Sequence, residues 1–400
     1  MKIIIKRRRK SILKQYVIIN GVIYTETDVL DRGHIFINEG KIMQIEPGAY
    51  HGDLPTLDAQ GHHVLPGFID IHMHGGYGED AMDASAQGLN HLATSLLSEG
   101  TTSFLATTMT QSDENIIRAL ETIAKYQAEQ DHTEEAEIAG VHLEGPFISE
   151  HKVGAQNPAY VQRPTVEKIK QYQAAANHLI KVMTFAPEVE GADEALRQLH
   201  DEIIFSIGHT VATYEGVTRA VEKGAQHITH LYNAATPFAH REPGVIGAAW
   251  HEQRLNTEII VDGIHSHPTA VAIAYHQKGN QHFYLITDAM RAKGMPDGHY
   301  DLGGQDVVVQ GAEARLANGA LAGSILKMNE GLRNLMTYTG DDLESLWRVT
   351  SLNQAQALHI DDVKGSIATG KDADLVIVDD ELTVKTTIKN GTIHTFENKE

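Results

Sequence analysis

Short runs of β-branched and apolar residues, separated by tight turns, occupy both ends of the chain. The N-terminal end contains YVIINGVIYT, HIFINEGKIMQIE and HHVLPGF, and the C-terminal end contains GSIATGKDADLVIVDDELTVKTTIKNGTIHTF. Asn-Gly and Glu-Gly pairs between such runs are typical of antiparallel hairpins. Neither end has enough apolar residues for a core of its own. We therefore expect one small β-sandwich domain built jointly from residues 16–66 and 356–400.

The middle of the chain, residues 67–355, alternates short apolar runs with longer amphipathic stretches. The apolar runs are GFIDIH, TSFLATT, IAGVHLE, IKVMTFAPE, IIFSIGHT, AQHITHLY, TEIIVDGIH and FYLITDA. Residues 87–98, 112–127 and 166–176 lie between them and place apolar side chains at helical spacing. Eight strands that alternate with helices predict an α/β fold, the (β/α)₈ TIM barrel.

Composition and charge exclude several classes of partner. Acidic residues outnumber basic ones 53 to 33, which gives a formal net charge of −20. Such a field repels polyphosphate, so we expect neither a nucleic acid nor a membrane as partner. The chain has no cysteine, which fits a cytoplasmic location and leaves His, Asp and Glu as metal ligands.

The first 15 residues differ from the rest of the chain. They contain the basic cluster of residues 6–10 but no uninterrupted apolar segment and no small-residue cleavage site. A secretory signal requires both of these features. We interpret residues 1–15 as a basic leader outside the folded unit and expect it to be disordered.

Two histidines stand where the first apolar run of the predicted barrel ends. His72 and His74 are two residues apart in PGFIDIHMHGG. Side chains two apart on a strand point the same way, so both imidazoles can bind one ion at about 2.0–2.1 Å. The alternative is an exposed His-X-His loop.

Four further chemically active residues follow other predicted strands. Glu144 ends the third run, His209 the fifth, His230 the sixth and Asp288 the eighth. Taken singly, the carboxylates could cap turns or helices and the histidines could be hydrogen-bonded core residues. Because the carboxyl ends of all barrel strands meet at one face, where active sites lie, the set favours a metal site.

The motifs PGFIDIHMHG, HLEGPF, IGHT, HLYNA and TDA occur in this order. In this respect the chain resembles the amidohydrolase superfamily and, within it, the family of deacetylases that act on amino-sugar phosphates. The resemblance extends from about Tyr16 to Phe396. It implies removal of acetate from N-acetylglucosamine 6-phosphate, which leaves glucosamine 6-phosphate, in amino-sugar catabolism.

The resemblance also implies roles for individual residues. The implied metal ligands are Glu144, His209 and His230 for the main ion and His72 and His74 for a second ion. One or two divalent ions per subunit are expected, with Zn, Fe or Mn as candidates. Asp288 is implied as the acid/base that takes a proton from the metal-activated water and returns it to the leaving amine.

The substrate contacts that the resemblance implies are Gln156, Asn233, Ala234, Arg241 and His265. Arg241 and His265 correspond to the phosphate-binding pair, and a guanidinium suits phosphate well. On its own, Arg241 in HREPG would be an ordinary surface charge. In the family one phosphate contact can come from a neighbouring subunit, so a homodimer is expected. The stretch ALAGS, residues 320–324, resembles a segment near the substrate.

Two alternatives remain open on the sequence. The chain could be another amidohydrolase that acts on a cyclic amide or a nucleobase. Many such enzymes bridge two metals with a modified lysine at the end of strand four, whereas here that run ends in FAPE and Lys181 lies at its beginning. A non-catalytic scaffold would usually have lost ligands or the aspartate after strand eight, and this chain has all of them.

Overall fold

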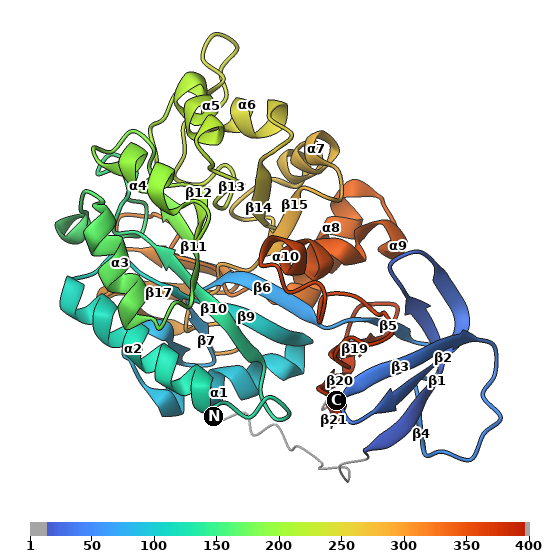
Figure 1. The fold of residues 1–400 in the computed structure, drawn as a ribbon. Helices are drawn as coiled ribbons and strands as arrows, with labels where there is room; N and C mark the ends of the chain where they lie inside the picture. Colours follow the sequence, from blue (N-terminus) through green and yellow to red (C-terminus); the bar gives the residue numbers. More distant parts are fainter. Residues whose placement is uncertain (1–13, 397–400) are drawn as a thin grey trace.

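The barrel is present in the computed structural model, which describes residues 14–396. Its strands are β6 (Phe68–Met73), β9 (Thr101–Thr108), β10 (Glu137–Glu144), β11 (Ile180–Phe185), β12 (Ile204–Ile207), β13 (His227–Ile228), β14 (Asn256–Ile260) and β15 (Phe283–Ile286). All of them pair in parallel, in chain order from β6 to β15 (Figure 1). A parallel bridge between Met73 and Ala289 joins the two ends of the sheet. The predicted fold class is confirmed.

Helices follow the strands and surround the barrel (Figure 1). They are α1 (Ala86–Leu96), α2 (Asp113–Glu129), α3 (Val166–Ala175), α4 (Ala192–Leu199), α5 (Tyr214–Glu222), α6 (Gly244–His251), α7 (Pro268–Lys278), α8 (Met328–Thr339), α9 (Leu343–Leu346) and α10 (Leu352–Ala357). Ser112 shows why they begin where they do: its hydroxyl accepts a hydrogen bond from Asn115 N at 3.3 Å and caps α2. Within residues 14–396, none of the helices is long and apolar enough to cross a bilayer.

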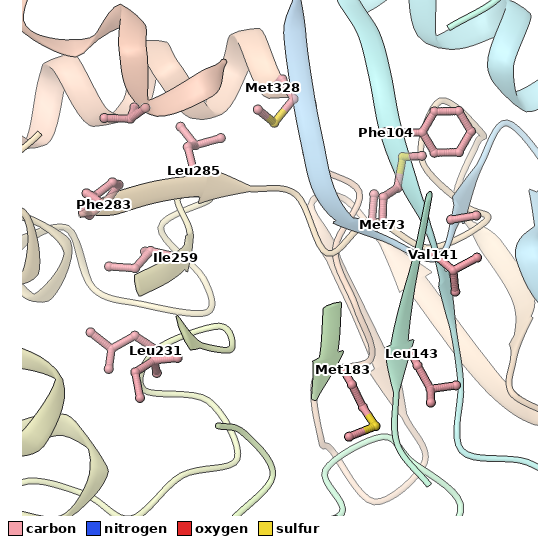
Figure 2. Packing of buried hydrophobic residues seen from close by; sticks show 14 of the residues in the cluster. Met73, Phe104, Val141, Leu143, Met183, Leu231, Ile259, Phe283, Leu285 and Met328 are labelled. Atoms are coloured by element: carbon pink, nitrogen blue, oxygen red, sulfur yellow. The ribbon is translucent and has the colours of Figure 1, made fainter. Parts of the chain in front are cut away.

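Strand alternation separates the core from the site. Val141 and Leu143 lie on the same side of β10, in the buried cluster between the barrel and its helices (Figure 2). Met73 of β6 lies in the same cluster, near Phe104 of β9 (Figure 2). Because neighbouring side chains on a strand face opposite ways, Glu144 is turned to the barrel interior.

The two ends of the chain form a second sheet, as predicted. Its strands are β1 (Gln15–Tyr24), β2 (Val29–Asn38), β3 (Lys41–Pro47), β4 (Thr56–Asp58), β5 (His63–Pro66), β19 (Leu375–Val378), β20 (Val384–Lys389) and β21 (Thr392–Thr395). The halves join where β5 pairs antiparallel with β19, for example Val64 with Ile377. Both residues belong to a separate buried cluster, so this β domain has its own core. The predicted leader lies outside the described residues up to position 13, and its last residue, Gln15, already begins β1.

The sequence interpretation missed a small three-stranded antiparallel sheet after β15. It consists of β16 (Gly298–Leu302), β17 (Gln305–Gln310) and β18 (Glu313–Leu316). Leu302 packs in a buried cluster with Met109 and Met290 of the barrel loops. The Gly-Gly pair at residues 303 and 304 and the β-branched run of residues 307–309 that follows it were the available signals. This sheet contributes a wall to the cavity described next.

Candidate active site

A cavity of about 490 Å³ opens at the carboxyl ends of the barrel strands. This volume lies within the range of sites for small molecules. Its wall includes His74, Glu144, Gln156, His209, His230, Asn233, Ala234, His265 and Asp288. Leu302 and Arg315 of the three-stranded sheet, residues 320, 321 and 323 of the ALAGS stretch, Met109 and residues 151–155 also line it. Most of the predicted site residues therefore share one cavity.

Three ligand atoms converge at the first group of predicted metal ligands. The Nε2 atoms of His209 and His230 lie 3.2 and 3.1 Å from Glu144 Oε1. The same two nitrogens lie 3.1 Å from each other. All three residues are buried, and their ligand atoms could hold one metal ion. Two imidazole nitrogens aimed at one carboxyl oxygen suit a shared cation.

A second group adjoins the first. His74 Nε2 lies 3.2 Å from both Asp288 Oδ1 and Glu144 Oε2. His72 Nε2 lies 3.4 Å from Glu144 Oε1 and 3.6 Å from Asp288 Oδ1, and it has no hydrogen-bond partner among the described residues. An unpartnered buried nitrogen facing two carboxyl groups fits a cation. Glu144 touches both groups: its Oε1 lies near His209, His230 and His72, and its Oε2 lies near His74.

The opposite ring nitrogens determine which nitrogen faces the cavity. Nδ1 of His209 donates to the carbonyl of Lys152 at 2.8 Å, and Nδ1 of His74 donates to that of Thr107 at 3.3 Å. A carbonyl can only accept, so Nδ1 carries the proton in both residues. In the neutral rings, Nε2 then offers its lone pair to the cavity, as metal binding requires.

Burial and the neighbouring charges shift the pKa values of the cavity residues in opposite directions. Burial raises the pKa of Asp288, but His72 and His74 outweigh it and lower that pKa to about 2. Burial raises the pKa of Glu144 as well, and His72 and the other facing histidines lower it well below its usual range. Burial lowers the pKa of His74, whereas hydrogen bonds with Asp288 and Glu144 raise it to about 10. The ionised carboxylates thus draw positive charge into the cavity.

The backbone is strained at the same place. His209, His230 and Asp288 have φ of 47°, 28° and 48°, in the left-handed region that large side chains rarely adopt. Such conformations cost on the order of 1–3 kcal/mol each and cluster at functional sites. Each of these residues lies two positions after the last residue of a barrel strand. The strained turns aim all three side chains back over the barrel mouth.

The structure places Gln156 and His265 in the cavity wall and leaves Arg241, another predicted substrate contact, outside it. Gln156 lies in the wall: its Oε1 accepts from Thr110 N at 2.7 Å, and its Nε2 donates to Glu144 Oε2 at 2.6 Å. His265 Nδ1 donates to Asp262 Oδ2 at 2.6 Å, and His265 lines the cavity. Arg241 is exposed on the loop between β13 and α6, which projects beside α5, and is not part of the wall (Figure 1).

Asn233 and Ala234 follow His230 in the wall of the cavity. The Asn233 amide nitrogen lies 3.3 Å from Leu231 O, and Ala234 O accepts from Thr210 N at 3.0 Å. Sequence reasoning also missed two cations of the wall, Lys152 and Arg315. Both lie in irregular or hairpin segments, where no periodic pattern marks a functional side chain.

Buried polar residues support the histidines from behind. His142 Nδ1 donates to Ile71 O at 3.0 Å, and its Nε2 lies 2.7 Å from Thr184 Oγ1. Burial lowers the pKa of His142 well below its usual range. Glu258, which the sequence interpretation missed, lies 3.0 Å from His72 Nδ1. The available signal was an acidic residue inside an apolar strand, NTEII, as at Glu144.

Comparisons with known proteins agree with this geometry. The sequence pattern of the amidohydrolase family matches residues 63–394. An N-acetylglucosamine-6-phosphate deacetylase of Bacillus subtilis is 48% identical over 379 residues, which cover 93% of this chain and 95% of the relative. An N-acetylgalactosamine-6-phosphate deacetylase of Escherichia coli O157:H7 is 36% identical over 373 residues, covering 93% and 97%.

A solved structure gives the same result. The N-acetylglucosamine-6-phosphate deacetylase of Pasteurella multocida superposes with a TM-score of 0.90 at 31% identity, covering 95% of this chain and all of that one (100%). Relatives above 30% identity over nearly the whole length share more than a fold. The chain therefore belongs to the amidohydrolase family, in its group of N-acetylglucosamine-6-phosphate deacetylases.

Proposed function

We propose that this protein hydrolyses the acetamide of N-acetylglucosamine 6-phosphate, giving glucosamine 6-phosphate and acetate. The observation that carries the proposal is the convergence of His209 Nε2 and His230 Nε2 on Glu144 Oε1, beside Asp288, in one cavity. Two relatives that match 93% and 95% of the chain carry the name of this activity.

The residues suit a divalent cation. Glu144, His209 and His230 would hold one ion, and His72, His74 and Asp288 form the group for a second. A bound divalent ion would supply Lewis acidity, which lowers the pKa of water toward about 7 and polarises an amide carbonyl. Zn, Fe and Mn all accept this set of nitrogen and oxygen donors. Gln156 holds Glu144 in place through its 2.6 Å hydrogen bond.

Asp288 is the group that moves the proton. Because its pKa is about 2, the carboxylate is ionised at neutral pH and can accept a proton from the attacking water. It then donates that proton to the amine nitrogen as the carbon–nitrogen bond breaks, and acetate is the other product. Its strained backbone, with φ of 48°, directs the carboxylate to the cavity.

The phosphate and sugar would occupy the rest of the cavity. A protein with a net charge of −20 needs local cations to hold a dianion. His265 is oriented by Asp262, which leaves its Nε2 as the atom for the ligand. Asn233 and Ala234 lie next to His230 in the wall and suit contacts to the sugar.

Arg241 serves the phosphate of a neighbouring subunit in this proposal, which makes the protein a homodimer. Its exposed position outside the cavity of its own subunit supports this. Co-expression of Arg241→Gln and Asp288→Asn chains tests it. Random pairing restores about a quarter of wild-type turnover if the arginine acts across a twofold interface. No restoration above the separate variants contradicts the shared site.

The galacto epimer is the second candidate substrate, because one relative of this length is named for N-acetylgalactosamine 6-phosphate. Acetate release should be measured from both phosphorylated sugars and from unphosphorylated N-acetylglucosamine. We expect kcat/KM to be highest for N-acetylglucosamine 6-phosphate and to fall by about 10²-fold or more without phosphate, because charge-assisted hydrogen bonds are lost. Equal rates with and without phosphate would refute the phosphate site, and preference for the epimer would change the substrate.

A further inference from the structure

Glu258 is a buried acidic residue for which the proposed reaction has no direct use. It lies in the middle of β14, and its side chain is 0% exposed. Its Oε2 accepts from His72 Nδ1 at 3.0 Å and lies 3.4 Å from the backbone nitrogen of His230. Its Oε1 has no hydrogen-bond partner among the described residues. Burying an ionisable carboxyl group costs free energy, so we expect this residue to have a role.

The hydrogen bond between His72 Nδ1 and Glu258 differs from the hydrogen bonds that Nδ1 of His74 and His209 make. His74 and His209 are held by neutral carbonyls, whereas His72 is held by a carboxyl group. A carboxyl group behind an imidazole fixes the protonated nitrogen and makes the opposite nitrogen a stronger ligand. For His72 that opposite nitrogen is Nε2, the atom without a partner that faces Glu144 and Asp288.

The cluster behind the cavity is not a further metal site, although His72, His142 and Glu258 lie close enough together. His142 uses both ring nitrogens, one toward Ile71 O and one toward Thr184 Oγ1. Its ring lies against that of His72, with centroids 4.3 Å apart. His142 therefore braces the His72 ring while Glu258 determines its tautomer.

We propose that Glu258 is a positioning residue that determines whether the second metal site, His72 with His74 and Asp288, is occupied. The inference rests on the proposed function insofar as it takes this cavity to bind divalent ions. Glu258 touches neither the ion nor the substrate: its side chain reaches the second site through His72 Nδ1, and of the three first-site residues it contacts only the backbone nitrogen of His230. The first site uses Glu144, His209 and His230, whose ligand atoms make no contact with Glu258.

The test measures metal binding directly. Wild-type, Glu258→Gln and Glu258→Leu proteins are freed of metal and titrated with Co²⁺, with binding followed by absorbance and by elemental analysis after dialysis. Glu135→Gln is the matched control. Glu135 is also buried, but it bonds Asn90 and Tyr126 before β10 begins and touches none of the ligands.

We expect two ions per chain in the wild type and in the control. Both Glu258 variants should keep the first ion with unchanged affinity and bind the second about 10–100-fold more weakly, with Leu worse than Gln. Thermal melting of the metal-free proteins reports the fold separately, and Glu258→Gln keeps the shape of the side chain.

Three outcomes would overturn the inference: a wild type that binds only one ion, variants that bind the second ion normally, or parallel weakening of both ions. Acetate release is measured in the same preparations. If the metal pattern is as expected but N-acetylglucosamine 6-phosphate is not deacetylated, the inference stands and the proposed function fails.

Discussion

Strand β10 carries a glutamate at each end, and the two differ in what neutralises them. Glu137, the first residue, lies 2.9 Å from Lys364 Nζ and 3.4 Å from Lys389 Nζ, next to the β domain. Glu144, the last residue, faces four histidines and the amide of Gln156, and none of its partners among the described residues is a lysine or an arginine. Both carboxylates are depressed in pKa against the effect of burial, Glu137 chiefly by Lys389 and Glu144 chiefly by His72. The partner decides what each can do.

Lysine carries a permanent charge, so the carboxylates around Glu137 are neutralised without any metal ion. Lys364 also contacts Asp372 and Asp374 at 2.9 Å, and Lys389 contacts Asp374 at 2.7 Å. Burial raises the pKa of Asp374, but Lys389 and Lys364 lower it to about 2. Histidine can exchange its proton for a metal ion at neutral pH. The same residue type therefore joins two domains at one end of a strand, and at the other end it belongs to a group that could hold a metal ion.

Exchanging each glutamate for glutamine gives the largest expected contrast. Glu144→Gln should lose bound metal and about 10⁴-fold in kcat/KM, because a metal supplies several kcal/mol of transition-state stabilisation. Glu137→Gln should lower the melting temperature and leave kcat and metal content unchanged. Steady-state assays with elemental analysis measure both. Retained metal in Glu144→Gln would show that the site lies elsewhere.

Asp288→Asn separates proton transfer from metal binding within the cavity. We expect kcat to fall by about 10³-fold, since general acid–base catalysis contributes about 10²–10⁴. The first metal ion should remain, because Asp288 is not in the group of Glu144, His209 and His230. Acetate release and metal content are the measurements. Near-normal turnover would remove Asp288 from its proposed role.

Lys389→Met breaks the closed cluster. Its side chain is 0% exposed, and the change leaves Asp374 with less positive charge around it. Breaking one partner of a buried pair typically costs about 3–5 kcal/mol of unfolding free energy. Turnover per folded molecule should not change. Lys385→Met is the control, because its ion pair with Asp379 is partly exposed and should cost about 1 kcal/mol or less. Equal losses in denaturant unfolding would contradict the assignment.

The smallest effect is expected at His227, in β13. His227 begins the strand, is 1% exposed, and burial lowers its pKa to about 3. The folded state keeps it neutral while the unfolded state gains a proton below about pH 6.5. The contribution of neutral His227 to the free energy of unfolding is therefore fully present above about pH 6.5. Below that pH it falls by about 1.4 kcal/mol per pH unit. Unfolding of metal-free wild type and His227→Gln between pH 7 and 5.5 should show the flatter slope in the variant. Identical slopes would mean that His227 is charged when folded.

The sequence by itself determined the barrel, the shared β domain and most of the site. Alternation within a strand and helical spacing between strands are local, so TSFLATT or residues 112–127 can be interpreted from their own pattern. The position of Glu144, His209, His230 and Asp288 after apolar runs followed in the same way. His-X-His and HLEGPF added the resemblance to the amidohydrolases.

Tertiary structure alone decided how these residues combine. Glu144 meets His230 across 86 positions of sequence, and His72 meets Glu258 across 186. It also placed the three-stranded sheet against the cavity and Arg241 outside it. The physical reason is that strand patterns record which face is buried and not which side chain lies opposite. Closure of the barrel and the strained turns above it bring these distant side chains to one point.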